Sequence, residues 1–199
     1  ESIPFSNLSY DFSNLYGSNC YNERKMEYEF LLKANDSVGL ELKRIEVENW
    51  LLSSNTKTCL IDDNLQGYYY NAECISVEFE DMNRIGKLKA IFIAYPFKIS
   101  KTYEGEILWD NFNFELDTLQ NTKFNVSDSL RINIYNPSII EVEPNIITDS
   151  MFEIILNDKK YTIEAGARKD YRFKFKQGNN SMFIRGNGNI EFKFRKEVL

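Results

Sequence analysis

Short segments in which apolar and polar residues alternate fill the second half of the chain, and they limit the possible fold more than any other feature. Eight of them follow one another at near-regular spacing: Asn111–Leu116, Leu130–Tyr135, Ile139–Glu143, Met151–Leu156, Lys159–Ile163, Tyr171–Lys176, Ser181–Arg185 and Asn189–Arg195. Alternation places one set of side chains in a core and the next set in solvent, as in a half-buried strand. Turn sequences separate several of these segments: Asn157–Asp158, Gly178–Asn180 and Gly186–Gly188. We therefore predict hairpins at these turns and a β-sandwich of the jelly-roll type.

The first hundred residues mix loop, strand and helix signals. Residues 1–22 are rich in Asn, Ser and aromatic residues, which predicts loops that pack across a sheet. The segment Arg24–Leu32 alternates as a half-buried strand does. Asp36 and its neighbours supply N-cap chemistry, so we expect a helix over about 39–52. We interpret its main apolar stripe as core, with a second apolar side opposite; the stripe is Val38, Leu42, Ile45 and Leu52, and the second side is Leu40, Val47 and Leu51.

The segment 68–80 contains a change of phase. Tyr70, Ala72 and Cys74 alternate in one phase, and from Ile75 onward the apolar residues continue one position out of step. Because a slip of one residue turns a strand over, the sequence predicts a β-bulge near Cys74–Ile75. The following segment, Leu88–Tyr95, is apolar on both faces, which is typical of a central strand, and Pro96 ends it.

Residues 98–107 contain few apolar side chains, and the character of the chain changes after them. A chain of 199 residues can form one large domain or two small ones. We therefore predict a mainly β protein with domains at 1–100 and 101–199. Limited proteolysis is expected to release a stable fragment of about residues 105–199.

Charge is distributed unevenly. The chain has a net charge of −6, which argues against generic nucleic-acid binding, yet residues 159–199 carry 11 basic and 4 acidic residues. If the two segments that hold them lie in one sheet, five cations cover one exposed surface: Arg172, Lys174, Lys176, Lys193 and Arg195. Such a basic face serves either as a solubilising surface or as a contact for an acidic partner or an anionic cell-wall polymer.

No motif in the sequence indicates catalysis, a cofactor or a metal. The chain lacks histidine, which excludes Ser-His-Asp and Cys-His nucleophile systems and zinc sites with His ligands. Asp62–Asp63 fits a turn better than a calcium site, and Tyr68–Tyr70 cannot form a three-ring platform on one face of a strand. The three cysteines form no CxxC pair and are interpreted as buried free thiols of a protein that folds in a reducing cytoplasm. No apolar run approaches the ~20 residues of a membrane span.

A series of short motifs resembles one family. In order they are Ser9–Ser13, Tyr16–Gly17, Tyr21-x-Glu23-Arg24, Glu48–Leu52, Leu60–Asp63 with Gly67–Tyr69, and Ala94–Lys98. In this order and spacing they resemble the distal tail protein of long-tailed, non-contractile phages of Gram-positive bacteria. The resemblance is strongest over residues 9–98, and the end of the chain, Gly186–Arg195, is similar in kind.

The resemblance implies a structural protein of the virion tail tip with no cofactor. Its N-terminal domain would be β-barrel-like with one packed helix, and a galectin-like sandwich would follow. Six copies would form a ring that joins the tail tube protein to tail-tip and receptor-binding proteins, without nucleic acid or membrane insertion. Aromatic residues in the first segment are the expected assembly contacts: Tyr10, Phe12, Tyr16 and Tyr21.

One departure and two alternatives accompany this interpretation. The family usually has further strands before the Ser-Tyr-Asp-Phe segment, whereas eight residues precede it here, so ring formation by this chain alone is expected to be weaker. The first alternative is a carbohydrate-binding module that recognises host cell-wall glycans. The second is a glycan-degrading enzyme, which would need two carboxylates facing each other in a cleft.

Overall fold

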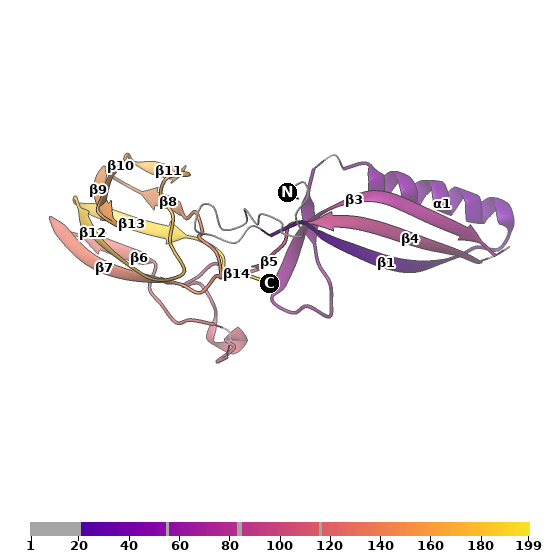
Figure 1. Ribbon diagram of the computed structural model, residues 1–199, viewed down its shortest axis with the longest axis horizontal. Coiled ribbons are helices and arrows are strands. Elements are labelled where there is room, and N and C mark those ends of the chain that lie inside the picture. The colour runs from indigo at the N-terminus through magenta and orange to yellow at the C-terminus, as the bar shows by residue number, and fades with distance from the viewer. Residues whose placement is uncertain (1–20, 55, 83–84, 116) are drawn as a thin grey trace, which may run out of the picture. The chain divides into compact units, whose positions relative to one another are not determined.

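The computed structural model describes residues 21–54, 56–82, 85–115 and 117–199, and these form two compact units (Figure 1). Unit 1 contains residues up to 58 together with 72–96. Unit 2 contains residues 59–71 and 97–199. The chain therefore passes between the units three times. The sequence pattern did not indicate that 59–71 belongs with the C-terminal residues.

Unit 1 is an antiparallel sheet with one helix. Strand β1 (Arg24–Lys33) pairs along its whole length with β4 (Ile85–Ala94), and β4 pairs with β3 (Tyr68–Asp81). Helix α1 (Ser37–Leu52) begins where Asp36 Oδ1 accepts a hydrogen bond from the backbone N–H of Gly39 at 2.7 Å, as the N-cap chemistry predicts. The predicted strand, helix and central strand are confirmed. The described strands of this unit form an open sheet and not a closed barrel.

The side of α1 that faces the sheet is opposite to the predicted one. Leu40 is 1% exposed, whereas Val38 is 69% and Leu42 63% exposed. Ile45 and Leu52 are exposed as well, so the stripe interpreted as core lies in solvent. Periodicity shows that a helix has apolar sides but does not show which side meets the sheet.

The predicted bulge is confirmed. Cys74 pairs with Phe92 and Ser76 with Ile91, which leaves Ile75 as the extra residue. Before the bulge, Ala72 and Cys74 are buried; after it, the less exposed positions move by one residue to Val77 and Phe79. The bulge thus keeps Ala72, Cys74, Val77 and Phe79 on one face of the sheet, while Ile75 is exposed.

Unit 2 is a β-sandwich of the jelly-roll type with two four-stranded sheets, ordered β10-β9-β12-β7 and β11-β8-β13-β6. The strands are β6 (Lys123–Val126), β7 (Ser129–Asn136), β8 (Asn145–Thr148), β9 (Phe152–Leu156), β10 (Lys159–Ile163), β11 (Gly166–Lys169), β12 (Gly178–Arg185) and β13 (Gly188–Lys193). Phenylalanine rings fill the space between the sheets: Phe152, Phe173, Phe175 and Phe192 are fully buried.

Three short strands complete unit 2 beside the sandwich. Strand β5 (Lys98–Ser100) pairs with β14 (Glu197–Val198) and with Tyr68–Tyr69 at the start of β3. Strand β2 (Thr58–Leu60) also pairs with β3. The chain end is therefore joined to β5, because Val198 pairs with Lys98, 100 positions earlier in the sequence.

Three of the predicted strands are wrong. The predicted strand at 111–116 is replaced by a 3₁₀ turn, η1 (Trp109–Asn111), and a loop over residues 112–115. Segments 139–143 and 171–176 share only the isolated bridge between Val142 and Phe175. In the last segment, side-chain amides replace a strand partner: Asn136 donates to the Phe175 carbonyl and Asn180 accepts from the Lys176 N–H. Alternation still predicted burial correctly, because Phe175 lies in the core.

The turns and thiols also differ in part from expectation. Asn157–Asp158, with positive φ at both residues, closes the predicted hairpin between β9 and β10. The turn at Gly186–Gly188 instead connects strands of different sheets, β12 and β13. Among the described cysteines, Cys74 is a buried free thiol as predicted, whereas Cys59 is exposed.

Candidate functional site

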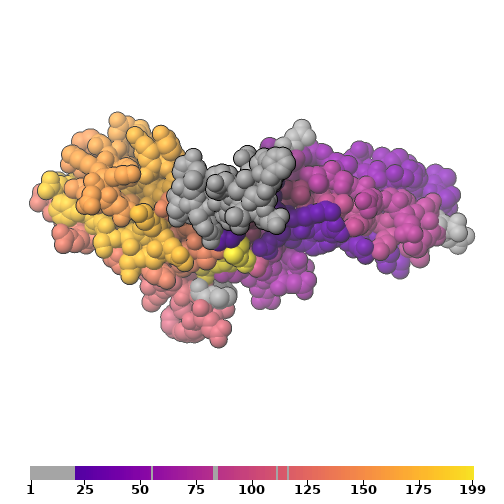
Figure 2. Space-filling view, viewed as in Figure 1, coloured from indigo at the N-terminus to yellow at the C-terminus, as the bar shows by residue number. Residues whose placement is uncertain are grey.

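A cluster of exposed aromatic side chains projects from unit 2. We call residues 107–119 the aromatic loop; it is the pink protrusion at the lower edge of the molecule in Figure 2. Trp109 stacks on Phe112 with ring centroids 5.8 Å apart, and Phe114 meets both rings edge-on at 5.8 and 5.2 Å. Trp109 is 69% and Phe114 78% exposed. Large rings that contact each other while remaining in solvent mark a surface suited to a partner.

Local hydrogen bonds fix the conformation of the aromatic loop. The Phe112 N–H donates to the Trp109 carbonyl at 3.2 Å, which closes η1. Asn113 and Asp117 then bond to each other's backbone: the Asp117 N–H donates to the Asn113 carbonyl at 2.8 Å, and the Asn113 N–H donates to Asp117 Oδ2 at 3.0 Å. These Asx interactions replace a sheet ladder, which explains why the alternating sequence here forms no strand.

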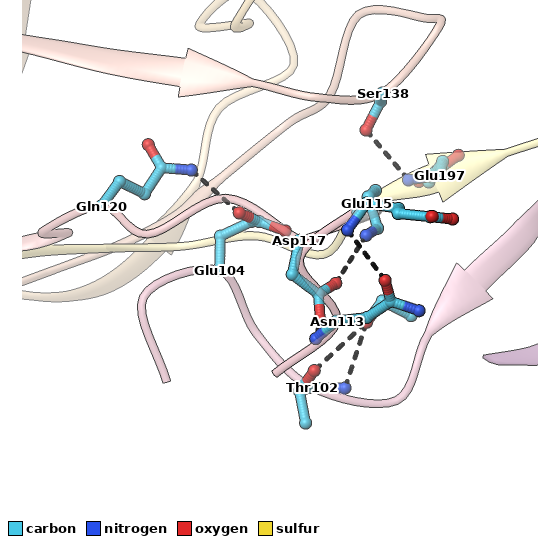
Figure 3. Close-up of polar contacts among 10 residues, drawn as sticks. Thr102, Glu104, Asn113, Glu115, Asp117, Gln120, Ser138 and Glu197 are labelled. Atoms are coloured by element: carbon cyan, nitrogen blue, oxygen red, sulfur yellow. Dashed lines mark hydrogen bonds and ion pairs between the residues drawn. The ribbon is translucent and has the colours of Figure 1, made fainter. Parts of the chain in front are cut away.

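A buried polar cluster holds the base of the aromatic loop (Figure 3). The Lys196 ammonium, 3% exposed, pairs with Asp117 at 2.8 Å and lies 5.5 Å from the centre of the Tyr68 ring. Gln120 donates to the buried Glu104 carboxylate at 2.9 Å and to the Tyr135 carbonyl at 2.8 Å. The cluster thus joins residues from four separate parts of the chain and fixes where the loop leaves the sandwich.

The carboxylates of this cluster have opposite pKa shifts. Burial raises the pKa of Glu104 above its ordinary value, and the hydrogen bond from Gln120 only partly offsets that effect. Burial also acts to raise the pKa of Asp117, but hydrogen bonds from Lys196 and the Asn113 backbone outweigh it, so the net shift is downward. For Lys196, burial lowers the pKa, and the bonds to Asp117 and Tyr68 more than reverse this, so the net shift is upward.

The exposed side of α1 is a second candidate surface. Val38, Leu42, Ile45 and Leu52 recur at spacings of four, three and seven residues and form one apolar stripe, the α1 stripe. Trp50, on a different side of α1, is 73% exposed. Four large apolar side chains in solvent on one side of a helix mark a surface suited to a partner.

The structure does not place the five residues predicted as a basic face in one sheet. Lys193 and Arg195 both lie over the Tyr103 ring, at 5.4 and 4.0 Å from its centre. Arg172, Lys174 and Lys176 lie in the segment that is not a strand, so the one-sheet arrangement assumed for the basic face is absent. Four of the five have local partners: Arg172 with Asp170, Lys174 with Glu143, Lys193 with Glu106 and Glu191, and Arg195 with the Ser100 and Lys101 carbonyls.

Of the predicted assembly contacts, only Tyr21 lies within the described residues, and it is exposed. Tyr10, Phe12 and Tyr16 lie outside them. The sequence does not identify the aromatic loop or the α1 stripe as exposed surfaces. Their apolar spacing predicts buried positions, because the sequence contains no signal for the Asx bonds or for the side of α1 that meets the sheet.

The other motifs have structural roles. Asp62 accepts hydrogen bonds from the N–H and the side-chain amide of Asn64, so the predicted Asx turn is confirmed. Tyr70 is buried, while Tyr68 and Tyr69 are half-buried beside Lys196 and Arg195. These rings therefore do not form a sugar-stacking platform on one face.

Two of the grooves on the surface of the sandwich are lined by polar side chains. One, of about 450 Å³, runs over β6, β13 and β8, where Asn189 bonds to Asn125 at 2.9 Å and to Asp149 at 2.7 Å. The other, of about 600 Å³, is cationic and lies between β10 and the residues that follow β11; its lining is Lys159, Lys160, Tyr161, Thr162, Asp170 and Arg172.

Within the described part of the chain, no three metal-ligating side chains gather at one point. In the same residues, no helix has the length and apolarity to cross a bilayer.

Comparison with known proteins gives a structural likeness. No protein-family model matches the chain, and no curated protein sequence matches it. Among solved structures, the chain is similar to the Dit protein (gp 19.1) of phage SPP1, described as a paradigm of the hub adsorption apparatus of phages that infect Gram-positive bacteria. The TM-score is 0.62 with 14% sequence identity, over 100% of this chain and 86% of the Dit chain. This chain has a Dit-like fold across both units.

Proposed function

We propose that the chain is a structural, non-enzymatic component of a phage tail tip or baseplate. In this role, six copies form a ring that joins the tail tube to tail-tip and receptor-binding proteins. The observation that carries the proposal is the Dit-like fold, which extends over the whole chain and not over the sandwich alone. The sequence motifs at residues 9–98 point to the same family independently of the coordinates.

The α1 stripe supports assembly through unit 1. A helix usually turns its apolar side toward the core, yet here the stripe lies in solvent while Leu40 alone of α1 is fully buried. Burying the four apolar side chains of the stripe at each of six contacts would stabilise a ring, because removal of apolar surface from water is favourable. Unit 1, with the stripe, is therefore the part we assign to ring formation.

Light scattering over a concentration series tests this assignment. We expect Leu42→Ser with Ile45→Ser to reduce assembly strongly, because it removes two apolar side chains from the stripe. Both residues are exposed, so the free energy of unfolding should change by no more than about 1 kcal/mol. The matched control is Lys43→Ser with Glu46→Ser, on the same helix outside the stripe. Equal assembly of the two variants would contradict the role of α1.

The place of the protein in a virion requires a separate measurement. Gold-labelled antibody against the chain should mark the tail tip in electron micrographs of intact particles. Label along the tail tube, on the head, or only on free protein would overturn the tail-tip proposal, even if purified protein forms rings.

Glycan binding is a second candidate function, favoured by the groove over β6, β13 and β8. Its polar residues Asn125, Asp149 and Asn189 lie side by side and can donate and accept hydrogen bonds, as sugar hydroxyls require. The three side chains already bond to one another, so a sugar would have to compete with these bonds. Titration with cell-wall polysaccharide fragments should shift the amide signals of these residues if the groove binds glycans, and Asn189→Ala should remove the shift.

A further inference from the structure

The aromatic loop has no role in the ring contact assigned to α1. Its base is held by the buried pair of Lys196 and Asp117, and its rings contact one another in solvent. We propose that the aromatic loop of one copy docks on the cationic groove of the adjacent copy, so that neighbouring sandwiches contact each other around the ring. The inference rests on the proposed ring and adds a second contact to it.

The aromatic loop is acidic as well as apolar. No lysine or arginine occurs between Lys101 and Lys123. Asp117 is paired with Lys196 within its own copy. Asp110 and Glu115 are exposed near the rings and have no ion pair among the described residues. The tip therefore presents aromatic faces together with two free carboxylates, and the surface that receives it must supply cations.

The cationic groove provides complementary chemistry. Lys159 is exposed with no ion pair in the described part of the chain, and Lys160 pairs only with Glu153. Arg172 lies at the other side of the groove, where it pairs with Asp170 and lies beside the exposed ring of Tyr171. Cations next to an aromatic ring favour an indole by cation–π attraction and carboxylates by charge pairing. The groove volume of about 600 Å³ lies within the range of ordinary binding pockets.

The placement of the two features favours contact between different copies. Within unit 2, the aromatic loop is on the lower side in Figure 1, whereas β10 and β11 are on the upper side. A copy therefore cannot fill its own groove. Contact between the aromatic loops of two copies would bring their acidic side chains together. Contact between the cationic grooves of two copies would likewise bring their cations together. The favourable arrangement is head to tail, which is the kind of contact from which rings are built.

Rigidity of the loop makes a small contact effective. The bonds between Asn113 and Asp117 hold the loop before any partner arrives, so little conformational entropy is lost on docking. A single aromatic anchor such as Trp109 often contributes most of the binding energy of an interface. Charge pairing at an exposed rim weakens with salt, whereas apolar contact through the α1 stripe does not. The two contacts can thus be separated by ionic strength.

A charge exchange in the full chain tests the contact. The loop variant is Asp110→Lys with Glu115→Lys, and the groove variant is Lys159→Glu with Lys160→Glu. The control, Asp63→Lys with Glu141→Lys, makes the same charge change as the loop variant at exposed positions elsewhere in unit 2. Sedimentation at low and high salt gives the concentration at which half of the chains are assembled. Circular dichroism checks that each variant is folded.

We expect the loop variant and the groove variant each to raise the half-assembly concentration about tenfold at low salt. Combining both variants in one chain should restore assembly, because the exchanged charges again attract. In a Trp50→Phe background, Trp109 is the one remaining tryptophan, and its emission should shift to the blue on assembly. The control variant should assemble like the unaltered chain.

The inference is overturned if the loop variant assembles like the control, if the combined variant is no better than either alone, or if Trp109 stays accessible to acrylamide in the assembled protein. The last result would mean that a different protein occupies the loop. Failure of the α1 contact has a different signature: the Leu42→Ser, Ile45→Ser variant then assembles normally. If the unaltered chain remains monomeric at every concentration, both proposals fall.

Discussion

Two buried carboxylates at the base of the aromatic loop respond to pH in opposite directions. Glu104 has a raised pKa in the folded protein because of burial, so the stability that its protonation contributes is present below its ordinary pKa of about 4.3 and is lost as pH rises through the folded value. Asp117 has a lowered pKa because bonds to Lys196 outweigh burial. Its contribution is present above about pH 4 and is lost as pH falls through its folded pKa.

Glu104→Gln should therefore stabilise the protein at pH 7. Glutamine keeps an oxygen that can accept the hydrogen bond from Gln120 and removes the buried charge. We expect a higher Tm at pH 7, and an increase of about 2–4 °C would correspond to about 1 kcal/mol for a chain of this size. The difference from the unaltered protein should shrink toward pH 4, where Glu104 becomes protonated. A constant difference across this range would show that the charge is not its cause.

Asp117→Asn should have the opposite effect, because it leaves the Lys196 ammonium buried without its carboxylate. Loss of one partner of a buried pair costs about 3–5 kcal/mol. Replacing both, as Asp117→Leu with Lys196→Met, should cost less than Asp117→Asn alone, since no charge then remains buried. Denaturant unfolding at pH 7 measures both variants. A double variant that is the less stable of the two would contradict this account of the pair.

The space around an added Cβ distinguishes two glycines that both have positive φ. Gly186 has φ of 145°, and an added Cβ would lie 2.9 Å from the Met151 carbonyl oxygen and 2.6 Å from the Phe152 ring. Gly67 also has positive φ, but nothing lies within 4 Å of its added Cβ. We expect Gly186→Ala to destabilise by about 2–4 kcal/mol and Gly67→Ala by about 1 kcal/mol. Urea unfolding of the two variants measures the difference between their free energies of unfolding. Equal losses of stability would show that the positive φ alone, and not the close contacts at Gly186, sets the cost.

At the scale of elements, the bulge in β3 corrects a sequence that is out of phase by one residue. Deleting Ile75 should be tolerated, because Cys74 and Val77 then fall two positions apart and share a face of a regular strand. Ile75 is exposed, so little burial is lost, and the expected cost is about 1 kcal/mol. Deleting Glu78 instead would turn Phe79 away from α1 and should prevent folding. Circular dichroism and thermal melts compare the two deletions.

Sequence patterns predicted these elements well where local chemistry decides the outcome. The N-cap at Asp36, the bulge at Ile75 and the hairpin at Asn157–Asp158 each depend on a few neighbouring residues. Alternation at Phe173 and Phe175 predicted burial correctly but a strand wrongly, because the missing ladder depends on Asn136, which lies far away in the sequence. The same kind of limit applies to the surfaces. The exposure of Leu42 and Trp109 depends on where the rest of the chain lies.

At the scale of the whole molecule, unit 2 depends on residues 59–71, which come before the last strand of unit 1 in the sequence. Tyr68 and Tyr69 pair with Ser100 and Ile99 of β5, and β5 also pairs with the chain end. The Lys101 N–H donates to the Gly67 carbonyl at 2.9 Å. Segment 59–71 is thus a structural part of unit 2, although the boundary expected at 98–107 would assign it to the other domain. Chain order and spatial order differ because β3 begins in one unit and ends in the other.

This arrangement predicts how fragments behave. Residues 97–199 alone lack Tyr68, so Lys196 loses the ring beside it and β5 loses one of its two neighbours. We expect this fragment to fold but to melt at a clearly lower temperature than residues 59–71 joined to 97–199 through a flexible linker. Tyr68→Ala in the joined protein should remove much of the gain, because it exposes Lys196, whereas Gln66→Ala, at an exposed position of the same segment, should not. Calorimetry compares the melting temperatures of the fragment, the joined protein and its Tyr68→Ala and Gln66→Ala variants. If the fragment melts at the same temperature as the joined protein, segment 59–71 contributes nothing to the sandwich, and its assignment to unit 2 is wrong.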